Sequence, residues 1–159
     1  ESNSVTSSGI DITGVVVPVD IPAACGPIPA SHPHVTLLAP FRARPRLDAA
    51  LCSELAAFFA TQRAFTMEFV AERRFVDGPR YLAPEPVDRI VAMTDALAVR
   101  YPDTPPYEGQ FRDIVPHCTL DLDGPAPRLP IAMPVTEAHL VHSFGDTWDV
   151  IARFPFANP

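Results

Sequence analysis

Short stretches in which apolar residues alternate with polar ones run along most of this chain and predict β-strands. In the clearest of them, Phe65–Val76, the side chains of Phe65, Met67 and Phe69 alternate with polar or smaller neighbours. A β-branched run at Gly14–Val19 is typical of a buried strand. The pattern predicts the following strands: Ile10–Val19, Pro33–Leu38, Phe65–Val76, Arg80–Ala83, Phe111–Asp121, Val135–Phe144 and Trp148–Phe156.

Two longer stretches carry their apolar residues at helical spacing instead. In the first, Leu47–Gln62, the side chains of Leu51 and Leu55 fall on one face. Asp48, near its start, suits the positive end of the helix dipole. The second, Val87–Arg100, also has one apolar face and follows a Pro-Glu-Pro sequence. The pattern thus places two helices among the strands.

Proline-rich loops separate these elements. The loops at Asp20–Ser31, Tyr101–Gly109 and Asp123–Pro130 are too short to link independent domains. Residues 1–9 are polar and show no periodicity, so we interpret them as a disordered tail or a cloning remnant. We expect residues 10–159 to form a single domain.

The composition is that of a globular protein, with 47% hydrophobic and 19% charged residues. The formal net charge is −7 and the chain contains no lysine, which disfavours long nucleic acid but allows a small anionic ligand. No apolar run approaches the roughly 18 residues of a membrane span. Three scattered cysteines, Cys25, Cys52 and Cys118, are interpreted as reduced thiols. We therefore expect a cytoplasmic, monomeric protein without membrane contact.

One short sequence occurs twice, about eighty residues apart. The two copies read Pro33-His34-Val35-Thr36-Leu37 and Pro116-His117-Cys118-Thr119-Leu120. In a strand, residues i and i+2 share a face, so each histidine lies beside its threonine while two apolar residues face the core. Proline lacks the N–H that a central strand uses, so each histidine should lie near the start of its strand.

The repeated residues suit acid–base chemistry on a phosphate. The reference pKa of histidine lies near 6.5, so one ring can act as a neutral base while the other is a protonated acid. The hydroxyls of Thr36 and Thr119 would donate to the phosphoryl oxygens, as in an oxyanion hole. This chemistry requires no metal and no cofactor. Which of His34 and His117 is the base stays open, because the roles swap with the direction of reaction.

The motif pair, with Leu-Leu-Ala-Pro-Phe in and after the first copy and Val-Pro before the second, resembles the two-histidine (2H) phosphoesterases. This superfamily includes the 2′-5′ RNA ligase-like proteins and the cyclic phosphodiesterases. The resemblance, which extends from about Gly14 to Phe156, implies a bilobal, pseudo-twofold α+β fold in which two antiparallel sheets line a central cleft with helices outside. It also implies four catalytic residues: His34, Thr36, His117 and Thr119.

The resemblance implies a metal-independent phosphodiesterase that hydrolyses or forms 2′,3′-cyclic phosphates or related small nucleotide phosphodiesters. Its partner would be a small nucleotide or an RNA end. A 2′-5′ RNA phosphodiesterase or ligase-like enzyme is the first alternative, and the negative charge disfavours it for long substrates. The second is a non-catalytic nucleotide-binding module, which would not need an acid–base pair.

Other side chains are weaker candidates for substrate contact. Phe41, Tyr81 and Tyr107 could stack on a base, although aromatic residues more often pack in the core or at its rim. Arg112, five residues before His117, could reach a phosphate, although a surface position is more common.

Two histidine pairs have spacings that zinc sites use. They are His32 with His34 and His139 with His142. No cysteine or carboxylate is in register with either pair, so the sequence predicts no metal site. Trp148 falls on the apolar face of its predicted strand and is expected in the core.

Overall fold

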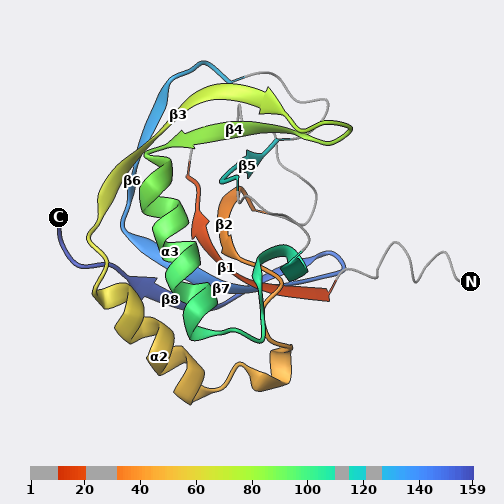
Figure 1. Cartoon of the computed structure of the whole chain (residues 1–159), viewed down its shortest axis with the longest axis vertical. Helices are drawn as coiled ribbons and strands as arrows, with labels where there is room; N and C mark the ends of the chain where they lie inside the picture. Colours follow the sequence, from red (N-terminus) through yellow and green to blue (C-terminus); the bar gives the residue numbers. More distant parts are fainter. Residues whose placement is uncertain (1–10, 21–31, 110–114, 121–126) are drawn as a thin grey trace, which may run out of the picture.

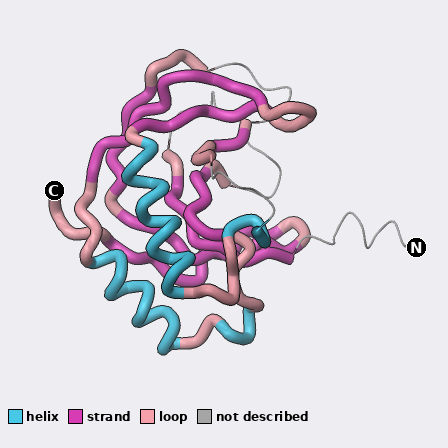
Figure 2. The backbone as a smooth tube through the Cα atoms, in the orientation of Figure 1, coloured by secondary structure: helices cyan, strands magenta, loops and turns pink. Residues whose placement is uncertain are grey.

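The computed structural model describes residues 11–20, 32–109, 115–120 and 127–159. Within these ranges it contains two four-stranded antiparallel sheets and two α-helices (Figure 1, Figure 2). Sheet 1 has the order β2-β1-β7-β8 and comprises β1 (Asp11–Pro18), β2 (His34–Leu38), β7 (Glu137–Phe144) and β8 (Thr147–Pro155). Sheet 2 has the order β5-β4-β3-β6 and comprises β3 (Phe65–Arg74), β4 (Arg80–Glu85), β5 (Cys118–Thr119) and β6 (Ile131–Val135).

The helices are α2 (Ala49–Ala60) and α3 (Val87–Arg100), with 3₁₀ turns at Arg44–Arg46 and Pro106–Gly109. The carboxylate of Asp48 accepts a hydrogen bond of 2.9 Å from the backbone N–H of Leu51, which caps the first turn of α2. Neither described helix is long and apolar enough to cross a membrane. The predicted α+β fold of two antiparallel sheets is confirmed.

The two sheets have matching strand orders, with a motif strand at one edge of each. The strands of each sheet are not consecutive in the chain, however. The β3–β4 pair, which follows the first motif, joins the sheet of the second motif, and the closing β7–β8 pair joins the sheet of the first. Each motif strand thus shares its sheet with one of these pairs. The pair that follows the first motif belongs to the second motif's sheet, and the pair that follows the second motif belongs to the first motif's sheet.

Strand β6 was not predicted from the sequence. The predicted loop ended at Pro130 and the next predicted strand began at Val135, yet Met133 and Val135 are buried while Pro134 between them is exposed. β6 pairs with β3 and is the edge strand of sheet 2, where a proline costs no ladder hydrogen bond. The alternation of apolar residues was the correct signal at this place.

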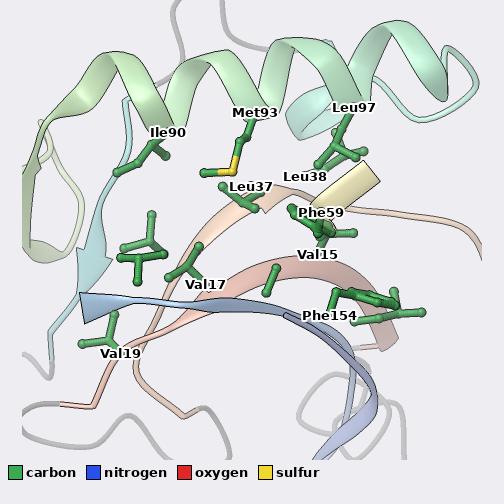
Figure 3. Close-up of a cluster of buried hydrophobic side chains, with 14 of the residues drawn as sticks. Val15, Val17, Val19, Leu37, Leu38, Phe59, Ile90, Met93, Leu97 and Phe154 are labelled. Carbon is green, nitrogen blue, oxygen red and sulfur yellow. The ribbon is translucent and has the colours of Figure 1, made fainter. Parts of the chain in front are cut away.

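The core lies on the face of sheet 1 that is opposite the motif histidine and threonine. Figure 3 shows Ile90, Met93 and Leu97 of α3 packing above Leu37 and Leu38 of β2. Helix α2 closes the other end of this face, where it contacts β8. Buried side chains of sheet 2 belong to the same core cluster, so both motif strands rest on one continuous apolar interior.

One hydrogen bond ties α3 directly to the first motif strand. The hydroxyl of Thr94, which is 1% exposed, donates to the carbonyl of Leu37 over 2.7 Å. Leu37 is the extra residue of a bulge, since Val15 pairs with Leu38 and Val16 with Thr36. The threonine therefore supplies a donor to a carbonyl at the point where the ladder is interrupted.

We predict that Thr94→Val lowers the free energy of unfolding by about 1–3 kcal/mol, because it leaves the buried Leu37 carbonyl without this donor. Urea unfolding measures the change. Val99→Thr, the reverse isosteric exchange at an 82% exposed position of the same helix, should stay within about 0.5 kcal/mol of the original protein. Equal stability of Thr94→Val and the original protein would contradict this role for the hydroxyl.

Candidate active site

The two motif strands lie at the edges of their sheets and contact each other. β2 is one edge strand of sheet 1, β5 is one edge strand of sheet 2, and the two are in contact. Figure 1 shows β2 and β5 close together near the middle of the molecule. Two segments about eighty residues apart in the sequence therefore meet in one place.

Strand register gives each motif the two-faced arrangement that the alternation predicts. In sheet 1, His34 lies opposite Pro18 and Thr36 opposite Val16, while Val35 between them is fully buried. We call the face of sheet 1 that carries His34 and Thr36 its motif face. The buried valine fixes the register, because a slip by one residue would place both polar side chains in the core.

The second motif repeats this arrangement in sheet 2. Thr119 lies opposite Tyr81 on β4, and Cys118 lies opposite Leu82. Cys118 and Leu82 are both fully buried, so the other face of this pair carries Thr119 and Tyr81. His117 immediately precedes β5, near the start of the strand as the leading proline indicates.

Each motif histidine donates a hydrogen bond to the main-chain carbonyl two residues before it. Nδ1 of His34 bonds the oxygen of His32 over 2.7 Å, and Nδ1 of His117 bonds the oxygen of Val115 over the same distance. A carbonyl can only accept, so Nδ1 carries the proton in both rings and Nε2 is left as the titrating nitrogen. In both copies the intervening residue is proline, which limits the backbone freedom of this short stretch.

Burial lowers the pKa of both histidines below the ordinary value. For His34 the main cause is loss of solvent, the bond to the His32 carbonyl opposes it, and the nearby charges of His117 and His32 add to the lowering. For His117 burial again lowers the pKa and the bond to Val115 opposes it. The contact between β2 and β5 brings the two motifs together.

Aromatic side chains pack against both rings. Trp148 lies 4.8 Å from His34 between ring centroids. His117 meets Phe75 edge-on at 4.9 Å and Tyr81 at 5.6 Å. Tyr81, a candidate from the sequence, is thus brought to the second motif, whereas Phe75 and Trp148 were not singled out for the site.

The position of Trp148 corrects the expectation that it belongs to the core. It is half-buried and contacts His34 because β8 contains a bulge: Val150 and Ala152 pair with consecutive residues of β7, and Ile151 between them has no opposite partner. The extra residue shifts the alternation by one. Trp148 and Val150 therefore lie on the motif face, while Phe154 points to the core.

Phe41, another candidate from the sequence, is not brought to the histidines. Phe41 is buried in the core, where its ring meets Tyr101 edge-on at 5.3 Å. Arg112 and the side chain of Tyr107 lie outside the described residues.

The two histidines of β7 lie on opposite faces and have separate partners. Nε2 of His139 donates to the carboxylate of Glu137 over 2.5 Å, and Nε2 of His142 donates to Asp11 over 2.6 Å. Across the described ranges, no cluster of three or more histidine, cysteine, aspartate or glutamate residues is arranged to hold a metal ion.

Comparison with known proteins agrees with this arrangement. The model of the 2′-5′ RNA ligase superfamily matches residues 23–146. TT0787 of Thermus thermophilus is similar in structure with a TM-score of 0.64 at 19% identity, covering 92% of this chain and 98% of that one. Escherichia coli LigT complexed with ATP gives a TM-score of 0.61 at 17% identity, with 92% and 98% covered. No curated protein sequence matches the chain.

At such low identity the solved structures show a common fold. The two antiparallel sheets match the two-histidine phosphoesterase fold that the sequence resemblance implies. Within that class, the chain belongs to the 2′-5′ RNA ligase superfamily, whose family model covers most of its length.

We predict that His34 and His117 are both Nδ1–H tautomers when neutral and that both titrate below about 6.5, the ordinary pKa of histidine. Long-range ¹H–¹⁵N NMR spectra recorded across a pH series report both properties, and the spectra of His34→Ala and His117→Ala assign the signals. An Nε2–H tautomer in either ring, or a midpoint above the ordinary value, would contradict the hydrogen bonding and burial described above.

Proposed function

We propose that this protein is a metal-independent phosphodiesterase that acts on 2′,3′-cyclic phosphates or related small nucleotide phosphodiesters. The observation that carries the proposal is the matched bonding of the two motif rings, in which Nδ1 of each donates to a main-chain carbonyl. Each ring then has Nε2 alone for proton transfer. Because the two motif strands are in contact, two such rings would supply one acid and one base for the same phosphate.

Hydrolysis of a cyclic phosphate would use both rings in one step. The neutral imidazole accepts a proton from water as the water oxygen bonds to phosphorus. The protonated imidazole donates its proton to the ribose oxygen as the bond from that oxygen to phosphorus breaks. The product is a phosphomonoester, and the two rings have exchanged protonation states, which solvent restores before the next turnover. Formation of a cyclic phosphate would run the same transfers in reverse.

The two threonines would hold the phosphoryl oxygens. Thr36 and Thr119 each share a face with a motif histidine, and their hydroxyls can donate to non-bridging oxygens, where negative charge increases in the transition state. Neither role requires a metal ion, because the rings transfer both protons and the hydroxyls bind the charge.

Small nucleotides suit the site better than long RNA. Escherichia coli LigT has been solved with 3′-AMP, with ATP and with NADP⁺, which are all small nucleotides. The present chain shares that fold and carries a net charge of −7. A polyanion would gain little from this surface, whereas one phosphate group can be held by local donors.

Loss of either ring should abolish most of the turnover of nucleoside 2′,3′-cyclic phosphates. Because each proton transfer is typically worth about 10²–10⁴ in rate, we expect His34→Ala and His117→Ala each to lower kcat by that factor. Initial rates with chromatographic separation of the 2′- and 3′-phosphate products give kcat and the regiochemistry together. His142→Ala, on the opposite face of β7, is the matched control and should retain the original rate.

The hydroxyl group of each threonine, and not the shape of its side chain, should determine the effect on kcat. Thr36→Val and Thr119→Val keep the volume and remove the donor, and a lost oxyanion-hole donor typically costs about 10²–10³ in kcat. Thr→Ser at the same positions retains the donor and should recover most of the rate. Equal rates for the valine and serine variants would leave the threonines with no role beyond packing.

The pH dependence follows from the lowered pKa values. As pH falls, protonation of the base lowers kcat/KM, and as pH rises, deprotonation of the acid lowers it. Since burial holds the pKa of both free rings down, both limbs and the maximum of kcat/KM should fall below about pH 6.5. A maximum above pH 7 would contradict this assignment.

Turnover should be unchanged in excess EDTA. Loss of activity in the chelator, with recovery on adding a divalent cation, would refute metal-independent catalysis. Tight nucleotide binding without any turnover would instead identify a binding module, the second of the two alternatives.

A further inference from the structure

Arg73 shares a face of sheet 2 with the second motif. Thr119 on β5 lies opposite Tyr81 on β4, and Tyr81 lies opposite Arg73 on β3, so the three residues form one cross-strand row (Figure 1). We call the face that carries this row the motif face of sheet 2. The proton transfers described above do not use Arg73, although it lies only two strands away from a threonine that would hold the reacting phosphate.

A β-bulge turns Arg73 toward this face. Phe69 is fully buried, and strict alternation from it along β3 would place Arg73 on the core face as well. The pairing of β3 with β4 shifts between Phe69 and Ala71, with Val70 as the extra residue, so the alternation is reversed beyond this point. Bulges of this kind often re-aim a side chain beside a functional site. The change of face therefore points to a role for the side chain of Arg73.

The hairpin of β3 and β4 carries three arginines that differ in their surroundings. Nε of Arg80 donates to the carboxylate of Glu72 over 2.8 Å, and this pair lies on the face opposite the motif. Arg74 lies opposite Arg80 and shares that face. Arg73 is exposed, and its side chain makes no ion pair or hydrogen bond within the ranges that the structure describes. Its guanidinium is thus available to a ligand on the motif face.

The charges on this face favour an anion at the hairpin end of the sheet. Glu68 and Glu85 lie opposite each other farther along the same face, and both are exposed. Their carboxylates would repel a negatively charged group. The row that ends at Arg73 contains a hydroxyl and an aromatic ring between strand edge and guanidinium, and no carboxylate. A negative group on the substrate would therefore lie toward Arg73.

The spacing of the row suits a second phosphate on the same small molecule. Neighbouring strands lie about 4.8 Å apart, so the backbones at Thr119 and Arg73 are separated by about 10 Å. A long arginine side chain covers much of that distance, which leaves its guanidinium within reach of a group one sugar away from the reacting phosphate. The planar guanidinium matches a phosphate with two parallel hydrogen bonds.

We propose that Arg73 binds a second phosphate group of the substrate, on the side of the second motif. The inference rests on the proposed function, since it takes the reacting phosphate to lie at His34 and His117. The preferred substrate then carries two phosphates, the cyclic diester that reacts and a terminal phosphate that Arg73 holds. The guanidinium supplies affinity and orientation and takes no part in proton transfer.

Two substrates that differ only in the second phosphate test this subsite. They are adenosine 2′,3′-cyclic phosphate with a free 5′-hydroxyl and the same compound with a 5′-phosphate. A hydrogen bond to a charged group is worth enough to change an equilibrium about tenfold. We therefore expect the original protein to prefer the phosphorylated substrate in kcat/KM by about that factor, and Arg73→Gln to lose the preference. High salt should weaken the preference as well, because the guanidinium is exposed.

Arg74→Gln is the matched control. It removes the same charge from the next residue along the hairpin, which is also exposed but lies on the opposite face. Substitutions at exposed positions change stability little, so both variants should fold, and the preference of Arg74→Gln should stay within about twofold of the original. No preference in the original protein, an unchanged preference in Arg73→Gln, or the same loss in both variants would overturn the subsite.

A binding measurement separates failure of this inference from failure of the proposed function. Calorimetry compares adenosine 3′,5′-bisphosphate with adenosine 3′-monophosphate. We expect the bisphosphate to bind about tenfold more tightly to the original protein and to Arg74→Gln, and Arg73→Gln to bind both equally. If neither cyclic phosphate is turned over but this pattern holds, the proposed function fails and the subsite stands. Equal affinities in the original protein, or no binding of either probe, would refute the subsite.

Discussion

A hydrogen bond from each motif histidine to the carbonyl two residues earlier is the constraint on which the site depends. It orients both rings and leaves Nε2 of each to exchange protons. It also opposes the lowering of the histidine pKa that burial causes. Because the acceptor is a main-chain carbonyl, no separate carboxylate is needed to orient each ring. The proline between donor and acceptor limits how far the acceptor can move.

The two halves of the site are alike in chemistry and different in surroundings. Each half presents an imidazole and a hydroxyl from an edge strand, yet His34 packs against Trp148 beside an open pocket, whereas His117 packs against Phe75 and Tyr81. A nucleotide is not symmetric, and a site with two identical halves could bind it in either direction. Under the proposed function, the different surroundings would give a nucleotide one orientation and so decide which ring meets the leaving oxygen.

Much of this site could be predicted from the sequence because its chemistry is local. A histidine and a threonine two residues apart share a face in any strand, and the repeat showed that two such faces belong together. Trp148 could not be placed in the same way, since the bulge at Ile151 depends on how β8 aligns with β7 and leaves no mark in the alternation. Strand β6 was missed for a related reason: Pro134 excludes a central strand, and only the assembled sheet reveals an edge.

The exchange of strand pairs between the lobes has a consequence for how the protein is made. β1 lies between β2 and β7, so the sheet that carries the first motif lacks half of its strands until β7 and β8, which follow the second motif in the chain, have left the ribosome. During synthesis β1 exposes an unpaired edge, the kind of surface that invites aggregation. Its long-range pairing with β7 also slows folding relative to a sheet built from neighbouring segments. The first histidine motif to be synthesised is thus the one whose supporting sheet is completed last.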